Sequence, residues 1–349
     1  MTSRVGFRCD AGPSIGVGHV MRCLALAEEL ASREIEPIFF ADVKSVPWAR
    51  EQLAARGFAV NEPPSRAEEH VDQFTRCAVD AVVFDSYHLS ADVYRAGREV
   101  GLTTMAIVDG PLQSAEADLF LDQNIGSEHD DVRLPEGSVR LAGLSYALLR
   151  DEVLAHRPSE PPTVNAVDAP RVLVVFGGTD AVGAGPVVLG VLAATRRPFH
   201  ADVVTPSDEL RAKAAAVELS DGQTVTTTGP TNRLAELVRA ADLVVSAAGS
   251  STWELLSLGA CAALVCVADN QLTGYQRLVD AGLVVGLGSL RDLTDPEQSQ
   301  TEVLSTLLTD HDRRQLLARA AWRSIDGRGR IRVADELLRI CGARPSSPL

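Results

Sequence analysis

The stretch RCDAGPSIGVGHVMR, residues 8–22, decides the fold, because it joins a β-rich run, Val5 to Phe7, to an amphipathic helical pattern. Apolar residues repeat at helical spacing after the loop: Val20, Cys23, Leu24, Ala27 and Ala31. The loop itself is rich in glycine, and glycine lets backbone approach a ligand closely at the start of a helix. The stretch therefore predicts the strand, loop and helix that open an α/β domain.

Similar β-rich runs alternate with helical patterns along the rest of the chain, which predicts parallel sheets with helices on both faces. These runs are Ile38–Phe40, Val82–Phe84, Met105–Val108, Val172–Phe176, Ala201–Val204, Val225–Thr227, Leu243–Ser246 and Ala262–Val267. The segment from His156 to Pro170 contains four prolines, Pro170 included. We expect two doubly wound Rossmann-like domains facing a cleft: residues 1–155, a linker at 156–170, residues 171–325, and a helix and tail at 326–349 that pack back on the first domain.

Composition narrows the class of ligand. The net charge of −14, without a run of Lys or Arg, argues against nucleic acid and anionic membranes as partners. We find no apolar stretch long enough to span a bilayer and no secretion signal, so we expect a cytoplasmic protein. The six cysteines are scattered without metal-ligand spacing, which predicts reduced core residues and no metal site. We also expect no cofactor.

His19 is the candidate catalytic residue. It lies where the helix should begin, and the positive end of the helix dipole lowers the pKa of an imidazole there. A neutral ring can act as a general base. The residues alone equally allow a His that caps or packs. The loop lacks the third glycine of the dinucleotide fingerprint, which argues against NAD.

Two loops in the second half suit a diphosphate. One follows the run Val172–Phe176 and the other follows Leu243–Ser246, so backbone N–H groups and small hydroxyls can face an anion there. The candidate nucleotide-binding residues are Gly177, Gly178, Thr179, Asp180, Gly249, Ser250, Ser251 and Glu254. Glu254 suits the ribose hydroxyls, but it can equally be a surface carboxylate that the helix dipole stabilises. Plain turns can likewise explain the glycines of the first loop.

Polar residues at other strand ends suit a sugar. Asn270 and Gln271 offer neutral amides after the run Ala262–Val267. Asp85 and Tyr87 follow Val82–Phe84, where Asp85 can orient His19 or bind substrate, and Tyr87 can donate to a sugar oxygen. Either residue can equally be structural.

Together, RCDAGPSIGVGHVMRCLALAEEL, DSYH, GLSYALLRDEV, FGGTD, SAAGSSTWELLSLG and ADNQ, in this order, resemble the UDP-sugar hydrolase of the pseudaminic acid pathway and related spore-coat polysaccharide proteins. The resemblance reaches about Gly286, and it implies a fold of the glycosyltransferase-B type. It also implies that a nucleotide sugar is the partner. The chain departs from the family at Ser86 and Gly110, which puts the identity of the sugar in doubt.

The resemblance assigns roles to matching positions. It makes His19 the base for water and places Glu254 on the ribose, with the two loops around the diphosphate. The substrate side comprises Asp10, Gly16, Gly18, Arg22, Asp85, Tyr87, Asn270 and Gln271.

The predicted reaction is inverting, metal-independent hydrolysis of a nucleotide sugar, because a nucleoside diphosphate leaves readily and one base is enough. A glycosyltransferase of the same fold is the leading alternative, since the same base could deprotonate an acceptor hydroxyl. The residues also allow a nucleotide-sugar 2-epimerase and a catalytically silent binder of nucleotide sugars.

Overall fold

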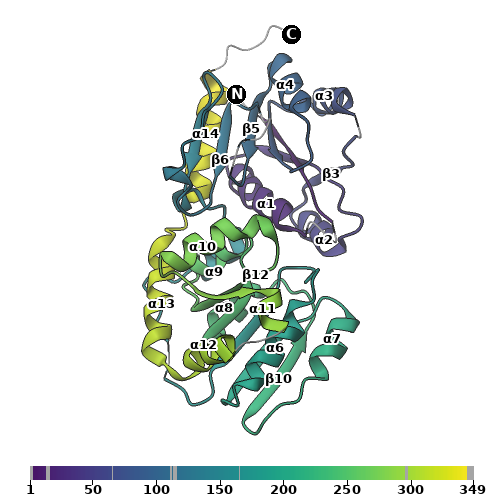
Figure 1. Cartoon of the computed structure of the whole chain (residues 1–349). Coiled ribbons are helices and arrows are strands. Elements are labelled where there is room, and N and C mark those ends of the chain that lie inside the picture. Colours follow the sequence, from purple (N-terminus) through teal and green to yellow (C-terminus); the bar gives the residue numbers. More distant parts are fainter. Residues whose placement is uncertain are drawn as a thin grey trace. The chain divides into compact units, whose positions relative to one another are not determined.

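The computed structural model describes residues 3–12, 16–64, 66–110, 112, 116–164, 166–294 and 298–343. The chain forms two compact units. The N-terminal unit comprises residues 1–151 together with 327–349, and the C-terminal unit comprises residues 152–326. Figure 1 traces both along the chain.

The N-terminal unit is built on a seven-stranded parallel sheet in the order β3-β2-β1-β4-β5-β6-β7. Its strands are β1 (Arg4–Cys9), β2 (Glu36–Phe40), β3 (Ala59–Asn61), β4 (Ala81–Asp85), β5 (Thr103–Ile107), β6 (Leu119–Asp122) and β7 (Val139–Ala142). The central strands are buried on both faces, and accordingly they read as nearly continuous apolar runs.

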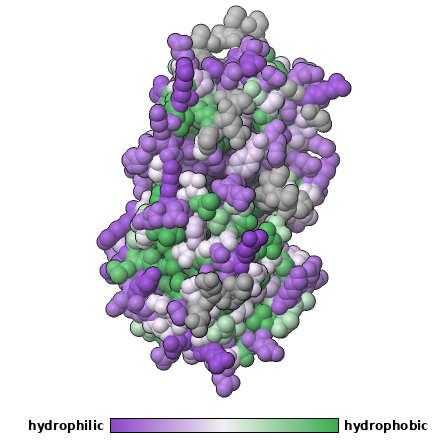
Figure 2. Space-filling model, in the orientation of Figure 1, coloured by the Kyte–Doolittle hydropathy of each residue, from purple (hydrophilic) through white to green (hydrophobic). Residues whose placement is uncertain are grey.

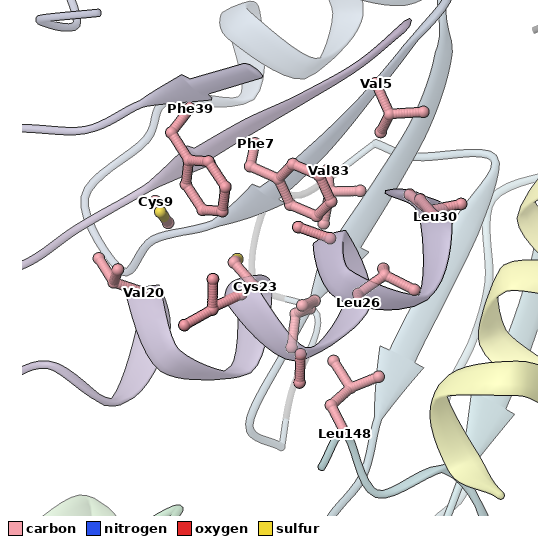
Figure 3. Packing of buried hydrophobic residues seen from close by; sticks show 14 of the residues in the cluster. Val5, Phe7, Cys9, Val20, Cys23, Leu26, Leu30, Phe39, Val83 and Leu148 are labelled. Carbon is pink, nitrogen blue, oxygen red and sulfur yellow. The ribbon is translucent and has the colours of Figure 1, made fainter. Parts of the chain in front are cut away.

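Each face of this sheet has its own helices and core. Residues of α1 (Gly18–Ala31), α2 (Pro47–Ala55) and α14 (Gly329–Ala343) pack with Val5, Phe7 and Val83 on one face (Figure 3). On the other face α3 (Ala67–Arg76) and α4 (Ala91–Glu99) cover an aromatic core. Two short 3-10 helices, Ser127–His129 and Leu144–Tyr146, follow β6 and β7.

The C-terminal unit has a six-stranded parallel sheet in the order β10-β9-β8-β11-β12-β13. Its strands are β8 (Arg171–Val175), β9 (Phe199–Val204), β10 (Gln223–Thr228), β11 (Leu243–Ala247), β12 (Ala262–Cys266) and β13 (Val285–Ser289). Its helices are α5 (Asp151–His156), which begins at the last residue of the N-terminal unit, α6 (Ala184–Ala194), α7 (Asp208–Ala215), α8 (Leu234–Ala240), α9 (Thr252–Ser257), α10 (Leu272–Asp280), α11 (Leu290–Thr294), α12 (Gln298–Thr309) and α13 (His311–Ser324).

The last helical stretch of the sequence forms two helices, α13 in the C-terminal unit and α14 in the N-terminal unit. Gly327 takes a φ of 79° between them, a conformation that ends the helical pattern. In the N-terminal unit, Arg330 of α14 binds Glu28 and Glu29 of α1. These ion pairs and the apolar contacts of α14 make the end of the chain part of the first domain.

The proline-rich segment 156–170 is hydrogen-bonded to α13. The indole N–H of Trp322 donates to the carbonyl of Pro158 at 2.9 Å, and Gln315 donates to the carbonyl of Pro162 at 2.7 Å. The segment has no helix or strand beyond His156 among its described residues, as four prolines dictate.

The chain's surface in the view of Figure 2 is mostly hydrophilic, with small separate hydrophobic patches. Within the ranges that the structure describes, no helix combines the length and the apolar character that a membrane span requires.

Candidate functional site

The polar residues of the N-terminal unit gather at the point where its sheet changes direction. From β1 the strand order proceeds to β2 on one side and to β4 on the other, so the helices after β1 and β4 leave toward opposite faces. Open α/β sheets bind ligands outside the carboxyl ends of their strands at such a point. His19 lies in the first turn of α1, and Asp85 is the last residue of β4.

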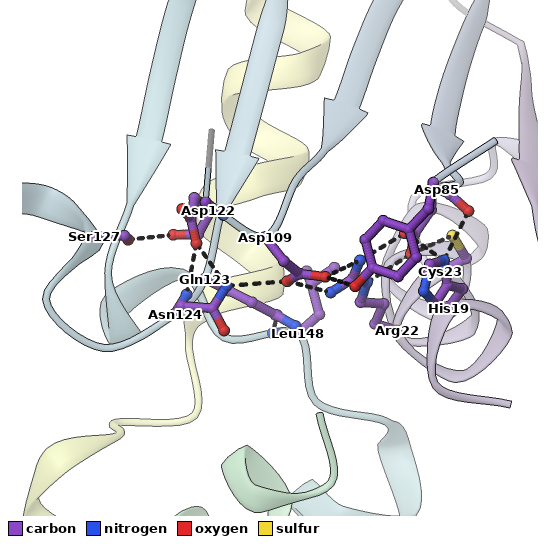
Figure 4. A network of polar contacts seen from close by, with 12 residues as sticks. His19, Arg22, Cys23, Asp85, Asp109, Asp122, Gln123, Asn124, Ser127 and Leu148 are labelled. Carbon is purple, nitrogen blue, oxygen red and sulfur yellow. Dashed lines mark hydrogen bonds and ion pairs between the residues drawn. The ribbon is translucent and has the colours of Figure 1, made fainter. Parts of the chain in front are cut away.

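The imidazole of His19 is held in one orientation. Its Nδ1 lies 3.0 Å from the carboxylate Oδ1 of Asp85 and 3.0 Å from the carbonyl oxygen of the same residue. The ring of Tyr87 meets it edge to face, with 4.7 Å between centroids. Both neighbours of Nδ1 are acceptors, so Nδ1 carries the proton and a neutral ring presents Nε2 as a proton acceptor (Figure 4).

The expectation of a lowered pKa for His19 is wrong. Burial lowers the pKa, as does the charge of Arg22, but the charge and hydrogen bonds of Asp85 outweigh both and raise the pKa above its usual value of 6.5. A nearby carboxylate at hydrogen-bond distance acts on the imidazolium more strongly than the helix terminus does. The ring therefore keeps its proton to a higher pH than an ordinary imidazole does.

Arg22 is placed differently from the substrate contact that the sequence predicts. Its side chain is 6% exposed, and its guanidinium lies between two carboxylates. It donates to both oxygens of Asp85 at 2.6 Å and to the two oxygens of Asp109 at 2.9 and 3.0 Å. Four of its five N–H groups are thus used within the protein. Arg22 orients the two carboxylates, and Asp85 in turn orients His19.

The network continues along the strand ends beyond Arg22. The hydroxyl of Tyr87 donates to Asp109 at 2.5 Å, and the amide of Asn124 bridges Asp109 at 3.0 Å and Asp122 at 2.8 Å. Burial raises the pKa of Asp109, but the charge of Arg22 and the hydrogen bonds from Arg22 and Tyr87 lower it by more. The net effect is a lowered pKa, so the carboxylate is ionised. The same opposing effects act on Asp85: burial raises its pKa, while the charges and hydrogen bonds of Arg22 and His19 lower it by more. The pKa of Asp85 therefore lies well below the usual range.

Sequence reasoning missed Asp122 and Asn124 because it did not predict β6. The signal is present: the apolar run Leu119–Leu121 ends in an acid, as the run before Asp85 does. Three neighbouring strands therefore end in, or are followed by, a carboxylate at one edge of the sheet, with Asp85, Asp109 and Asp122 in sheet order.

The loop between β1 and α1 is described at its two ends. Gly16 has a φ of 80° and forms an isolated bridge with Gly12, with N–H to carbonyl distances of 2.7 and 3.1 Å. Gly18 is the first residue of α1. Asp10 binds Arg8 through its Oδ1 at 2.8 Å. Residues 13–15 of the predicted ligand loop lie outside the described residues.

The C-terminal sheet has its own change of direction, between the paired strands β8 and β11. Gly177, Gly178 and Thr179 follow β8, while Gly249, Ser250 and Ser251 follow β11, so the two predicted diphosphate loops lie at the same edge. Gly177 is exposed with a φ of 65°. Ser251 precedes α9, and its hydroxyl makes no capping hydrogen bond to the helix.

Asp180 has a structural role that the sequence did not predict. Its buried carboxylate accepts the backbone N–H of Ala184 at 2.8 Å and of Gly185 at 3.0 Å, which are the first N–H groups of α6. Burial raises the pKa of Asp180 in spite of these bonds. The carboxylate occupies the positive end of α6, so this end is not open to a phosphate.

The remaining predicted residues of this unit lie near the same loops. Glu254 is half-buried in the first turn of α9. Asn270 is exposed on the 3-10 helix Asp269–Gln271, and Gln271 accepts the N–H of Val267 at 3.0 Å. A methyl group added at Gly249 would lie 3.6 Å from the amide nitrogen of Gln271, which places these two residues side by side.

Searches among protein-family models found no match. The chain is 24% identical over 266 residues to the uncharacterized protein MJ1062 of Methanocaldococcus jannaschii, which covers 73% of this chain and 54% of that protein. The match thus spans about half of that relative. The spore coat polysaccharide biosynthesis protein SpsG of Bacillus subtilis is 24% identical over 94% of this chain and 96% of its own length.

Solved structures establish the fold. MurG of Acinetobacter baumannii matches 97% of this chain and 99% of its own with a TM-score of 0.68 and 16% identity. The spinosyn rhamnosyltransferase SpnG, complexed with thymidine diphosphate, gives 0.61 over 97% of this chain and all of its own, at 17% identity. CalG4, the calicheamicin glycosyltransferase, gives 0.64 over 98% and 99%, at 15% identity. The chain has the glycosyltransferase-B fold predicted from its sequence.

These neighbours overturn the predicted hydrolysis. Several structures that match nearly the whole chain are glycosyltransferases, and they favour transfer to an acceptor, the leading alternative, over attack by water. A putative UDP-N-acetylglucosamine 2-epimerase of Listeria monocytogenes also matches 99% of this chain, with a TM-score of 0.62 and 12% identity. The resemblance to spore-coat polysaccharide proteins stands in part, through SpsG.

Proposed function

We propose that the protein transfers a sugar from a nucleotide sugar to a hydroxyl group of an acceptor. The observation that carries the proposal is the pairing of His19 with Asp85. Because Nδ1 is held by acceptors, Nε2 of the neutral ring is the atom that can take a proton. Glycosyltransferases among the structural neighbours of the whole chain support transfer to an acceptor.

The reaction needs one proton transfer and one displacement. His19 Nε2 removes the proton of the acceptor hydroxyl while the acceptor oxygen attacks the anomeric carbon. The bond from that carbon to the nucleotide phosphate breaks with its electron pair, and the nucleoside diphosphate leaves. The configuration at the anomeric carbon inverts. Asp85 stabilises the imidazolium that forms, and Arg22 holds Asp85 in place.

We assign the nucleotide to the C-terminal unit. Gly177–Thr179 and Gly249–Ser251 share an edge of the sheet, and their backbone N–H groups and hydroxyls suit a diphosphate. Glu254 is assigned to the ribose. The complex of SpnG with thymidine diphosphate supports a nucleoside diphosphate as the ligand class. Tyr87, Asn270 and Gln271 are assigned to the sugars.

A panel of UDP-, GDP- and dTDP-sugars tests the proposal in the presence of pooled sugar and aglycone acceptors. Mass spectrometry should detect a new glycoside together with the free nucleotide. The Gly249→Ala variant serves as a donor-side probe, because an added methyl group would meet only an ordinary van der Waals contact, and we expect the variant to fold. If nucleotide sugars bind and no glycoside forms with any acceptor, the proposal fails.

A further inference from the structure

A second polar cluster lies at the same edge of the N-terminal sheet, on the face opposite to His19. In the sheet register Arg8 of β1 is level with Phe40 of β2 and Phe84 of β4. Side chains at matched positions of parallel strands point to the same face. Phe40 and Phe84 belong to the core under α3 and α4, so Arg8 points to that face as well.

Aromatic contacts place two further polar residues over Arg8. The ring of Phe74 on α3 packs on Phe40 at 5.0 Å and on Phe84 at 6.1 Å between centroids. His70, one turn earlier on α3, stacks on Phe74 at 6.0 Å, and Tyr94 of α4 packs on Phe84 at 4.6 Å. His70 and Tyr94 therefore close over the end of β1.

Three polar atoms of this cluster are buried without a hydrogen-bond partner among the described residues. They are Nε of Arg8, Oδ2 of Asp10 and Nδ1 of His70. His70 is 3% exposed. Leaving a buried polar group without a hydrogen bond is costly, so buried polar atoms almost always have partners. Three such atoms together at the ligand-binding edge of a sheet point to a ligand that completes their hydrogen bonds.

The cluster specifies the chemistry of that ligand. Arg8 and Asp10 form an ion pair at 2.8 Å, so their charges cancel. Burial, followed by the charge of Arg8, lowers the pKa of His70 to about 4, and the ring is neutral at physiological pH. The three atoms that lack a hydrogen-bond partner within the described part of the chain are one donor, one acceptor and one ring nitrogen that can be either. An uncharged group with hydroxyls matches all three.

We propose that Arg8, Asp10 and His70 form a binding site for the hydroxyl groups of an uncharged carbohydrate, which is part of the acceptor. The assignment to the acceptor rests on the proposed transfer reaction. The site is separated from the His19 network by the sheet itself, and the two share the carboxyl ends of β1 and β4. The acceptor class is thereby a neutral sugar or glycoside, since Asp10 disfavours an anion and Arg8 disfavours a cation.

Nitrogen-15 spectra of histidine in the full-length protein test the site directly. Methyl glycosides of common hexoses and N-acetylglucosamine serve as neutral probes, and inorganic phosphate serves as the anionic probe. We expect the Nδ1 resonance of His70 to shift with a neutral probe and not with phosphate. The experiment contains no nucleotide sugar, so a failure of the transfer reaction leaves its result unaffected.

Two variants complete the test. Asp10→Asn can replace the acceptor Oδ2 of Asp10 by an amide donor. His70→Phe keeps the stacking on Phe74 but removes the ring nitrogen Nδ1. Each should raise the dissociation constant of the neutral probe about tenfold. His129→Phe is the matched control, because that side chain is 84% exposed outside the cluster, and it should leave binding unchanged. Absence of a shift with every neutral probe, a shift with phosphate, or equal binding by all variants would overturn the proposal.

Discussion

The two sheets end their strands in different chemistry. In the N-terminal unit the strand ends carry three carboxylates, two of which bind Arg22, whereas in the C-terminal unit they carry glycines and small hydroxyls. Fixed charges orient a base, and backbone donors suit an anionic ligand. This difference is the ground on which we propose that the N-terminal unit supplies the base and the C-terminal unit holds the nucleotide. Substitutions in each unit can break or sharpen this division.

The largest effect is expected at His19. His19→Ala removes the base of the N-terminal unit and should lower kcat for glycoside formation by about 10²–10⁴-fold. The dissociation constant of the nucleotide should stay unchanged, because the C-terminal unit is assigned to hold it. Steady-state kinetics and nucleotide titration measure the two quantities. His129→Ala is the control, and equal rates for both variants would remove His19 from the chemistry.

Asp85→Asn should weaken the fold of the N-terminal unit. The carboxylate is fully buried between Arg22 and His19, and removing one partner of a buried ion pair costs about 3–5 kcal/mol. Urea denaturation measures the loss in the free energy of unfolding. Asp92→Asn removes an exposed pair with Arg95 on α4 and should cost under about 1 kcal/mol. Similar losses in the two variants would contradict the buried network.

In the C-terminal unit, Asp180→Ala should cost about 1–2 kcal/mol, since the carboxylate caps the N–H groups of α6. Thermal unfolding of the variant measures this loss. Asp208→Ala, at an exposed position in the first turn of α7, is the matched control and should stay within about 0.5 kcal/mol. An Asp180→Ala variant that keeps its stability but loses nucleotide affinity would restore the predicted ligand role of Asp180.

The smallest effect is a shift in pH dependence. Asp85 raises the pKa of His19, so kcat/KM should increase with pH through a midpoint above 6.5. The protonated ring stabilises the folded state below its unfolded pKa, and this contribution is lost as pH rises through the folded pKa. Asp85→Asn should move the midpoint of activity down. A midpoint below 6.5 in the unaltered protein would contradict the pairing.

The sequence predicted the fold because apolar runs between helical patterns are a local signal. All nine predicted runs form strands, β1 among them, as a buried parallel sheet requires. The strands β3, β6, β7 and β13 escaped prediction. The first three have only three or four residues, and β13, VGLGS, contains two glycines, which weaken a β-strand signal.

The site was predicted in its residue types but not in its pairings. His19 and Asp85 lie 66 positions apart in the sequence, and only the alignment of β1 with β4 brings them together. The same alignment reverses the expected pKa shift of His19. The role of Arg22 depends on Asp85 and Asp109, which belong to different strand ends, so no local spacing could reveal it.

Oxygen-18 water distinguishes transfer from hydrolysis most directly. The protein is incubated in labelled water with its nucleotide sugar, with and without an acceptor, and the products are weighed by mass spectrometry. The account predicts nucleotide release that depends on the acceptor and a glycoside without the label. Free sugar that carries one labelled oxygen, released equally fast without an acceptor, would contradict it.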